Sequence, residues 1–433
     1  MDKKSNEKTA PDGGFGWCVC AAACVTQFIL AGVENSFGVL FIYILDEFDA
    51  GKADSAWVGS IHQGFLYILA PFVTMAADLW GCRMTSLVGG ILCVAGLGAS
   101  SFATRVYHLF LTYGVVFGTG ACFVFITTYR AISLWFKRHL ALVNGICTAG
   151  QYSGTIVFSQ VIQLVVEQKG LSGTFRILAG IASVMVFIAL VYRQPPDTPG
   201  GTSPEKLCVK PKDIFDFSLL KDKSFFIFLL GTSLYAFGCY VPATHAPAFS
   251  RETGVSKDKA PFLLIAWSIS SFFLSLVTGK LADKFRSHRV QIFQVAMIGV
   301  ASSTALISGA WLFEIFVALM VLYGAFDSGF VLLRAVVAED LVGSDKASRG
   351  VGLMFGALGF AYLAGIPLAG WIFDTTQSYP LSFTVASLLS ATGCCLLFLI
   401  QLVQKVEKSS GCTNKNTGYR LSLEQQEKQE TAL

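Results

Sequence analysis

The chain has 433 residues, of which 54% are hydrophobic and 14% are charged, and its formal net charge is +4. Soluble globular proteins carry about 25% charged residues, so this composition excludes a soluble enzyme, a nucleic-acid-binding protein and a secreted disulfide scaffold. Lipid is the solvent that suits such a chain, and twelve helices of roughly 20 apolar residues each would use roughly 240 residues.

Apolar stretches alternate with short polar breaks, and they predict an all-α membrane protein with twelve transmembrane helices. The first stretch is longer than a bilayer requires, so we expect its helix to tilt or to project beyond the membrane. The predicted spans are residues 15–45, 57–77, 84–104, 107–129, 139–166, 173–192, 224–246, 260–281, 290–309, 311–336, 350–372 and 380–403.

The distribution of lysine and arginine predicts the orientation of these spans. Of the 32 such residues, 25 fall on the side that holds both termini and 6 fall on the opposite side. By the positive-inside rule, both termini are expected in the cytoplasm, which an even number of spans allows.

Two cytoplasmic loops carry the same pattern and indicate an internal duplication. Asp78 and Arg83 follow the second span, and Asp283 and Arg286 follow the eighth. We expect these groups to act as conformational latches, because an aspartate near the N-terminus of a neighbouring helix is stabilised by the positive helix end. The predicted organisation is a cytoplasmic N-terminus (1–14), a six-helix half (15–192), a cytoplasmic linker (193–223), a second six-helix half (224–403) and a disordered cytoplasmic tail (404–433).

The twelve cysteines lie mostly in apolar runs, where a thiol behaves as a small hydrophobic group. No His or Cys partners occur at ligand spacing, and the chain has no phosphate-binding Gly-rich loop and no arrangement of nucleophile and base. We therefore expect no disulfide framework, no metal site, no cofactor and no enzymatic activity.

The two Asp-Gly-Arg loops resemble those of the major facilitator superfamily. The segment 12–17, Asp-Gly-Gly-Phe-Gly-Trp, resembles the first-helix signature of the monocarboxylate transporter family (solute carrier family 16), and 135–145 with Gly150 and Gly154 is similar to its fifth-helix signature. The resemblance covers nearly the whole chain. It implies two six-helix halves around a midplane cavity, which open in turn to each side of the membrane.

Within this family, the chain resembles the branch that carries aromatic amino acids and thyroid hormones. The segment 237–245, which ends at His245, is similar to that branch's seventh helix, and Asp327 matches its tenth-helix aspartate. Asn35 stands where lactate carriers have a lysine, and Ser275 stands where the family has an arginine that contacts the substrate carboxylate. The resemblance thus implies a transporter without the usual proton–lactate chemistry.

Ionisable side chains inside the predicted spans are the main candidates for a substrate site. A charge in lipid costs several kcal/mol, so each needs a partner or an aqueous cavity. Glu34, Arg130, His245, Asp327 and Arg334 lie on the first, fourth, seventh and tenth helices, which the resemblance places around the cavity. Asp327 and Arg334 are two helical turns apart and therefore share one face.

We hypothesise that the substrate-binding cation has moved away from position 275. Arg334 or Arg130 would bind the carboxylate through its bidentate guanidinium, with Asp327 holding Arg334 in the cavity. The alternative for Arg130 is that its side chain extends to the cytoplasmic headgroups.

Two further candidates keep two interpretations each. Glu34 could take up a proton once per transport cycle, or it could be a fixed ion-pair partner that balances the charge of the cavity. His245 could donate a hydrogen bond to the substrate, or it could be a polar group hydrated at the outer end of its helix.

The sequence predicts a plasma-membrane carrier of small organic monocarboxylates, with facilitated passage of aromatic or neutral amino acids or related hormones favoured. The alternatives are a proton-coupled symporter of short monocarboxylates such as lactate, pyruvate and ketone bodies, and a sensor or scaffold that no longer transports. A proton is the candidate co-substrate, and the family resemblance adds a single-span accessory glycoprotein as a candidate partner. The C-terminal residues Glu430–Leu433 are similar to a ligand of PDZ domains.

Overall fold

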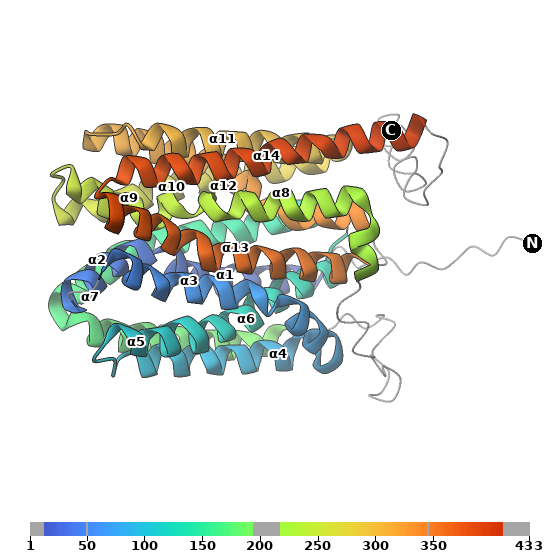
Figure 1. Ribbon diagram of the computed structural model, residues 1–433. Coiled ribbons are helices and arrows are strands. Elements are labelled where there is room, and N and C mark those ends of the chain that lie inside the picture. Colours follow the sequence, from blue (N-terminus) through green and yellow to red (C-terminus); the bar gives the residue numbers. More distant parts are fainter. Residues whose placement is uncertain (1–12, 49–50, 138, 194–216, 344–345, 410–433) are drawn as a thin grey trace, which may run out of the picture.

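The computed structural model of the protein describes residues 13–48, 51–137, 139–193, 217–343 and 346–409. In these ranges all regular secondary structure is helical (Figure 1). The first half contains α1 (Gly16–Asn35), α2 (Phe37–Phe48), α3 (Lys52–Ile68), α4 (Ala70–Ser100), α5 (Val106–Leu109), the π-helix Phe110–Phe117, α6 (Gly118–Trp135) and α7 (Leu140–Ile188). The second half contains α8 (Lys223–Cys239), α9 (Val241–Glu252), α10 (Ala260–Lys284), α11 (Arg289–Ile307), α12 (Phe313–Val342), α13 (Ala347–Thr376) and α14 (Tyr379–Ser409).

Ten helices in the described part of the chain are long and apolar enough to cross a membrane. Two of them contain a glycine with non-helical backbone angles, Gly81 (φ 80°) in α4 and Gly170 (φ 70°) in α7. Glycine adopts positive φ without the steric penalty of a side chain, so each of these positions ends one helix and starts the next. With α3 joined to the first part of α4, division at Gly81 and Gly170 yields the twelve crossings of the predicted fold.

The first crossing of each half is interrupted near its middle. Ser36 separates α1 from α2, and Tyr240 separates α8 from α9. Pro242 occupies the first turn of α9, where its missing N–H leaves no hydrogen bond unmade. The long first stretch of the sequence is therefore two helices rather than one tilted helix.

Helices within each half pack at very short range through glycines. A Cβ atom at Gly154 of α7 would overlap the backbone of Phe28 in α1, and one at Gly238 of α8 would overlap Ala386 in α14. Small residues let helices approach closely in lipid, where apolar surface alone does not drive helices together. Each half is thus a tightly packed bundle.

The two halves meet along two helix pairs. In Figure 1 the first half forms the lower layer and the second half the upper layer. Helix α3 packs against α13, and α7 packs against α10. Large apolar side chains such as Phe102 and Phe187 remain exposed on the outside of the bundle, as expected for surfaces that face acyl chains.

Several predictions fall on residues that the structure does not describe. They are Asp12 of the first signature, most of the 193–223 linker, the tail beyond Ser409 and the C-terminal peptide Glu430–Leu433.

Candidate functional site

Two small hollows lie between the halves. The first, here named the central hollow, has a volume of about 20 Å³ and is lined by Glu34, Asn35, Gln63, Tyr67, Gln151, Cys239, Tyr240, Trp267, Asp327, Phe330, Val331, Arg334 and Tyr362. The second hollow has a volume of about 10 Å³ and is lined by Glu34, Phe37, Gly59, His62, Gln63, Tyr240, Thr244 and Ile366. Each has room for a water molecule or two, so the site is contracted.

Arg334 is the cation of the central hollow. Its side chain is only 2% exposed, and its Nη2 donates a hydrogen bond to the Tyr67 hydroxyl at 3.0 Å. The guanidinium also lies 5.1 Å from the ring centres of Tyr67 and Phe355 and 5.7 Å from that of Phe330. Its Nε has no hydrogen-bond partner. Aromatic rings thus hold the guanidinium in place while part of its donor capacity stays unused.

Asp327 lines the same hollow but does not hold Arg334, contrary to our expectation. Tyr152 donates its hydroxyl to Asp327 Oδ2 at 2.8 Å, and Trp267 donates its indole N–H to the same oxygen at 3.1 Å. Within the described chain the carboxylate forms no ion pair with Arg334. The partners of the carboxylate are instead two neutral donors from α7 and α10.

Glu34 and Asn35 of the first half also line the central hollow. Gln63 donates to Glu34 Oε1 at 2.7 Å, and Asn35 both donates to Thr155 at 3.1 Å and accepts from Tyr240 at 2.7 Å. Both residues end α1, next to the break at Ser36. The break therefore directs the last side chains of α1 into the space between the halves.

His245 lies beyond the second hollow rather than in its lining. It is fully buried, its Nε2 is 3.2 Å from the carbonyl oxygen of Ile366, and its ring packs edge-on against Phe41 at 5.3 Å. Its neighbour Thr244 lines the hollow instead. His245 thus forms part of the wall behind the second hollow. Its side chain is not hydrated at a helix end, and it does not line the central hollow.

Two predicted site residues lie elsewhere. Arg130 pairs with Asp78 at 2.9 Å, with both side chains about one-third exposed, and no residue of the fourth crossing appears in either lining. Ser275 is buried between α10 and α7, where its Oγ bonds the carbonyl oxygens of Phe272 at 2.8 Å and Gly145 at 3.5 Å. The central hollow therefore takes its cation from α12 alone, and Arg130 belongs to the predicted Asp78 loop.

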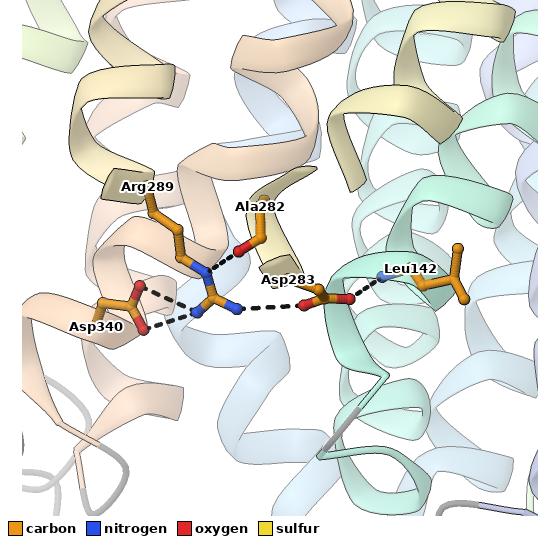
Figure 2. A network of polar contacts seen from close by, with 5 residues as sticks. All are labelled: Leu142, Ala282, Asp283, Arg289 and Asp340. Carbon is orange, nitrogen blue, oxygen red and sulfur yellow. Dashed lines mark hydrogen bonds and ion pairs between the residues drawn. The ribbon is translucent and has the colours of Figure 1, made fainter. Parts of the chain in front are cut away.

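The predicted latch at Asp283 joins the two halves (Figure 2). Asp283 Oδ2 accepts a hydrogen bond at 3.0 Å from the backbone N–H of Leu142, in the first turn of α7. Its other oxygen pairs at 3.3 Å with Arg289, which also binds Asp340 at 3.1 Å. The cation defined here is Arg289, three residues beyond the predicted Arg286. We name these residues the Asp283 cluster: Leu142, Ala282, Asp283, Arg289 and Asp340.

The other predicted latch does not cross between halves. Asp78 pairs with Arg130 inside the first half, and Arg83 donates to the carbonyl oxygen of Leu190 at 3.0 Å, also inside the first half. The two duplicated loops are alike in sequence, but among the described contacts of their four predicted latch residues, the hydrogen bond between the halves comes from the second loop.

A second set of contacts joins the halves at the opposite end of the bundle. Lys52 pairs with Glu252 and lies 3.4 Å from the ring centre of Phe373. Arg251 pairs with Asp46 at 3.6 Å, and Asp374 accepts from the backbone N–H of Ala53 at 2.9 Å. We name this set the Lys52 cluster: Asp46, Lys52, Arg251, Glu252, Phe373 and Asp374. With contacts across both ends, the hollows are closed off from either side.

The sequence did not identify the neutral residues that complete the site. Gln63 and Gln151 are polar residues inside apolar spans, and this signal could have selected them. Tyr67, Trp267 and Tyr240 carry no comparable signal, because aromatic residues are common in transmembrane helices. Only the packing reveals that they face the hollow.

Comparison with known proteins places this arrangement in a family. Residues 23–288 and 228–414 match the profile of the Major Facilitator Superfamily. Monocarboxylate transporter 10 of Danio rerio is 31% identical over 421 residues, which cover 95% of this chain and 83% of that protein. The chain belongs to the monocarboxylate transporter family of the Major Facilitator Superfamily.

Other relatives agree with this membership, and a solved structure agrees with the fold. Monocarboxylate transporter 10 of Rattus norvegicus is 30% identical (94% of this chain, 82% of that protein), and monocarboxylate transporter 4 of Mus musculus is 29% identical (90% and 84%). The crystal structure of the human organic anion transporter MFSD10 (TETRAN) superposes with a TM-score of 0.69 at 12% identity, over 88% of this chain and 99% of that one. The chain is thus a multi-pass membrane transporter of small molecules with the major facilitator fold, and not an enzyme.

Proposed function

We propose that this transporter carries amino acids, with a preference for aromatic or other neutral side chains or related hormones, across the plasma membrane by facilitated alternating access. Both termini would face the cytoplasm, so that the Asp283 cluster closes the cytoplasmic entrance and the Lys52 cluster closes the extracellular one.

The observation that carries this proposal is the state of Arg334. A guanidinium that is 2% exposed and has no carboxylate partner is costly to bury, and its retention calls for a compensating ligand. A substrate carboxylate would accept a bidentate pair of hydrogen bonds from the donors of Arg334 that are left unused.

The charges around Arg334 favour a substrate that also carries a cation. Glu34 and Asp327 line the same hollow, and the hydrogen bonds that they accept use one oxygen of each carboxylate. A third anion placed between them without a cation of its own would be repelled. An amino acid avoids this repulsion because its ammonium group can face a carboxylate while its own carboxylate faces Arg334.

The walls of the hollow suit an apolar or aromatic side chain. Trp267, Tyr240, Tyr362 and Phe330 contribute rings to the lining. Aromatic pairs gain roughly 0.5–1.5 kcal/mol beyond the burial of their area. The similarity of residues 237–245 and Asp327 to the aromatic amino acid and thyroid hormone branch supports the same substrate class.

The test is uptake of a labelled panel of amino acids and short monocarboxylates into cells or proteoliposomes, with surface expression measured separately. Hydrogen bonds to charged groups contribute about 1.5–3 kcal/mol each, so Arg334→Gln should lower uptake at least about tenfold at normal expression. Arg130→Gln is the matched control, because it removes an arginine that lies outside both hollows. Equal uptake by the wild type and Arg334→Gln would refute the proposal.

Proton-coupled symport of short monocarboxylates is the second candidate, and the same charges favour it in part. A substrate without an ammonium group would leave two carboxylates beside its own, and a proton on Glu34 or Asp327 would relieve that repulsion. Lactate uptake driven by an inward proton gradient, in the absence of amino acid uptake, would select this candidate.

A further inference from the structure

The second hollow continues the central hollow toward the Lys52 end. The two share Glu34, Gln63 and Tyr240, so one solute can extend across both. On α3, His62 of the second hollow precedes Tyr67 of the central hollow by five residues, which places it about 7.5 Å nearer to Lys52.

Both halves supply the walls of the second hollow. Phe37 and His62 come from the first half, and Thr244 and Ile366 come from the second. The hollow therefore widens when the halves separate at this end. Its volume of about 10 Å³ describes the closed state only.

His62 is the unusual member of this lining. Its side chain is 2% exposed, and neither Nδ1 nor Nε2 forms a hydrogen bond of ordinary geometry, although the backbone of Tyr113 lies nearby. Its ring stacks on Phe117 at 4.7 Å and packs against Tyr113 at 5.2 Å. Packing of this kind fixes the ring and leaves its nitrogens without a well-formed hydrogen bond, which is destabilising in a buried group.

We propose that the second hollow binds the far end of the substrate and that His62 selects substrates whose far end carries a hydroxyl or N–H group. This inference rests on the proposed amino acid transport. Phe37 and Ile366 offer apolar walls for a ring, and the imidazole offers one donor and one acceptor to a group on that ring. The class of side chain is therefore an aromatic ring with a polar substituent, as in tyrosine, in preference to an unsubstituted ring, as in phenylalanine.

A site that hydrogen-bonds a substrate hydroxyl discriminates strongly against the analogue that lacks it, because the buried polar group is then left without a partner. A substrate hydroxyl that met only an apolar wall would not make the site discriminate between tyrosine and phenylalanine in this way. The ratio of KM values for phenylalanine and tyrosine thus reports on His62 itself.

The experiment measures this ratio for the full-length wild type and three variants, His62→Leu, His62→Gln and Tyr113→Phe. We expect the wild type to favour tyrosine about tenfold and His62→Leu to bring the ratio near one, mainly by raising the KM for tyrosine. His62→Gln keeps hydrogen-bonding groups and should retain part of the preference. Tyr113→Phe removes one unpartnered hydroxyl beside the His62 ring, outside the lining, and should leave the ratio unchanged.

The outcomes separate this inference from the proposed function. Uptake that depends on Arg334 but shows no tyrosine preference in the wild type, or the same preference in His62→Leu, overturns the role of His62 alone. Absence of Arg334-dependent uptake of both amino acids overturns the proposed function, and the subsite with it. If His62→Leu does not reach the membrane, the KM ratio of His62→Gln is the test. A preference for tyrosine equal to that of the wild type in this variant, which has no imidazole, also overturns the role of His62.

Discussion

Asp283 accepts a hydrogen bond at 3.0 Å from the backbone N–H of Leu142, although the two residues belong to different halves of the transporter. The N–H groups in the first turn of a helix have no partner within that helix, and the helix end carries a partial positive charge. The Asp283 carboxylate of the second half thus caps α7 of the first half. This contact must break when the two halves separate at the Asp283 end.

We expect Asp283→Asn to open this entrance more often. A charge at a helix N-terminus contributes about 0.3–2 kcal/mol, so the ratio of closed to open molecules should fall by about two- to thirtyfold. The measurement is the rate at which a maleimide labels a cysteine introduced at Ser275, which is fully buried between the halves. Asp78→Asn is the control, because its partner Arg130 lies in the same half. Similar labelling rates in the two backgrounds would exclude the latch.

The opposite entrance should respond to the charge pair of Lys52 and Glu252. Exposed ion pairs contribute about 0.2–1 kcal/mol, so Lys52→Glu or Glu252→Lys should each raise the labelling of a cysteine placed at Thr244 by about two- to fivefold. The double exchange should restore closure only in part, because a lysine at 252 would not have the contact that Lys52 makes with Phe373. High salt should reduce the differences. A double exchange that labels as fast as either single variant would show that the pair does not close the entrance.

Glu34 distinguishes the two modes of transport. If it is a fixed partner for the substrate ammonium, wild-type uptake should not depend on an imposed pH gradient, and Glu34→Gln should lower uptake about tenfold or more at every pH. The amide can still contact Gln63, which limits damage to the fold. Uptake that rises with an inward proton gradient in the wild type, and loses that response in Glu34→Gln, would instead establish proton coupling through this residue.

Gly154 tests the packing inside the first half. A Cβ at this position would overlap the backbone of Phe28, and overpacking typically costs about 1–3 kcal/mol, so Gly154→Ala should lower the melting temperature in detergent. Gly180 lies in the part of α7 beyond Gly170 with nothing within 4 Å of a Cβ, and Gly180→Ala should raise stability by about 0.4–1 kcal/mol. A stability change of the same sign in both variants would contradict this view of α7.

The apolar pattern of the sequence was sufficient to predict the fold. Lipid imposes the length of each span, so the twelve crossings follow from the positions of the apolar runs. The division into two halves was predicted from the repeated aspartate loops after the second and eighth spans. The breaks at Ser36 and Tyr240 were not predicted, although each has a local signal: Ser36 ends a polar triplet with Glu34 and Asn35, and Pro242 follows Tyr240 by two residues.

The candidate site was predicted in part. Glu34, Asp327 and Arg334 were selected because charge is costly in lipid, Asn35 was selected through the family resemblance, and the structure brings these four together at the central hollow. Arg130 met the same criterion yet lies at a helix end, where it pairs with Asp78. The free-energy cost of burying a charge identifies unusual residues in the sequence, but it does not tell which of them line the central hollow.

The interrupted first helix of each half has a consequence for how the two entrances work. The short helices α2 and α9 pack against each other, and they carry Asp46 and Arg251 of the Lys52 cluster. A short helix joined at one residue can change direction without displacing the helix before it, so we expect the Lys52 end to open by bending at Ser36 and Tyr240. The helices that carry Asp283 and Asp340, α10 and α12, are continuous, so we expect opening at the Asp283 end to move whole helices. The two ends would then open at different rates.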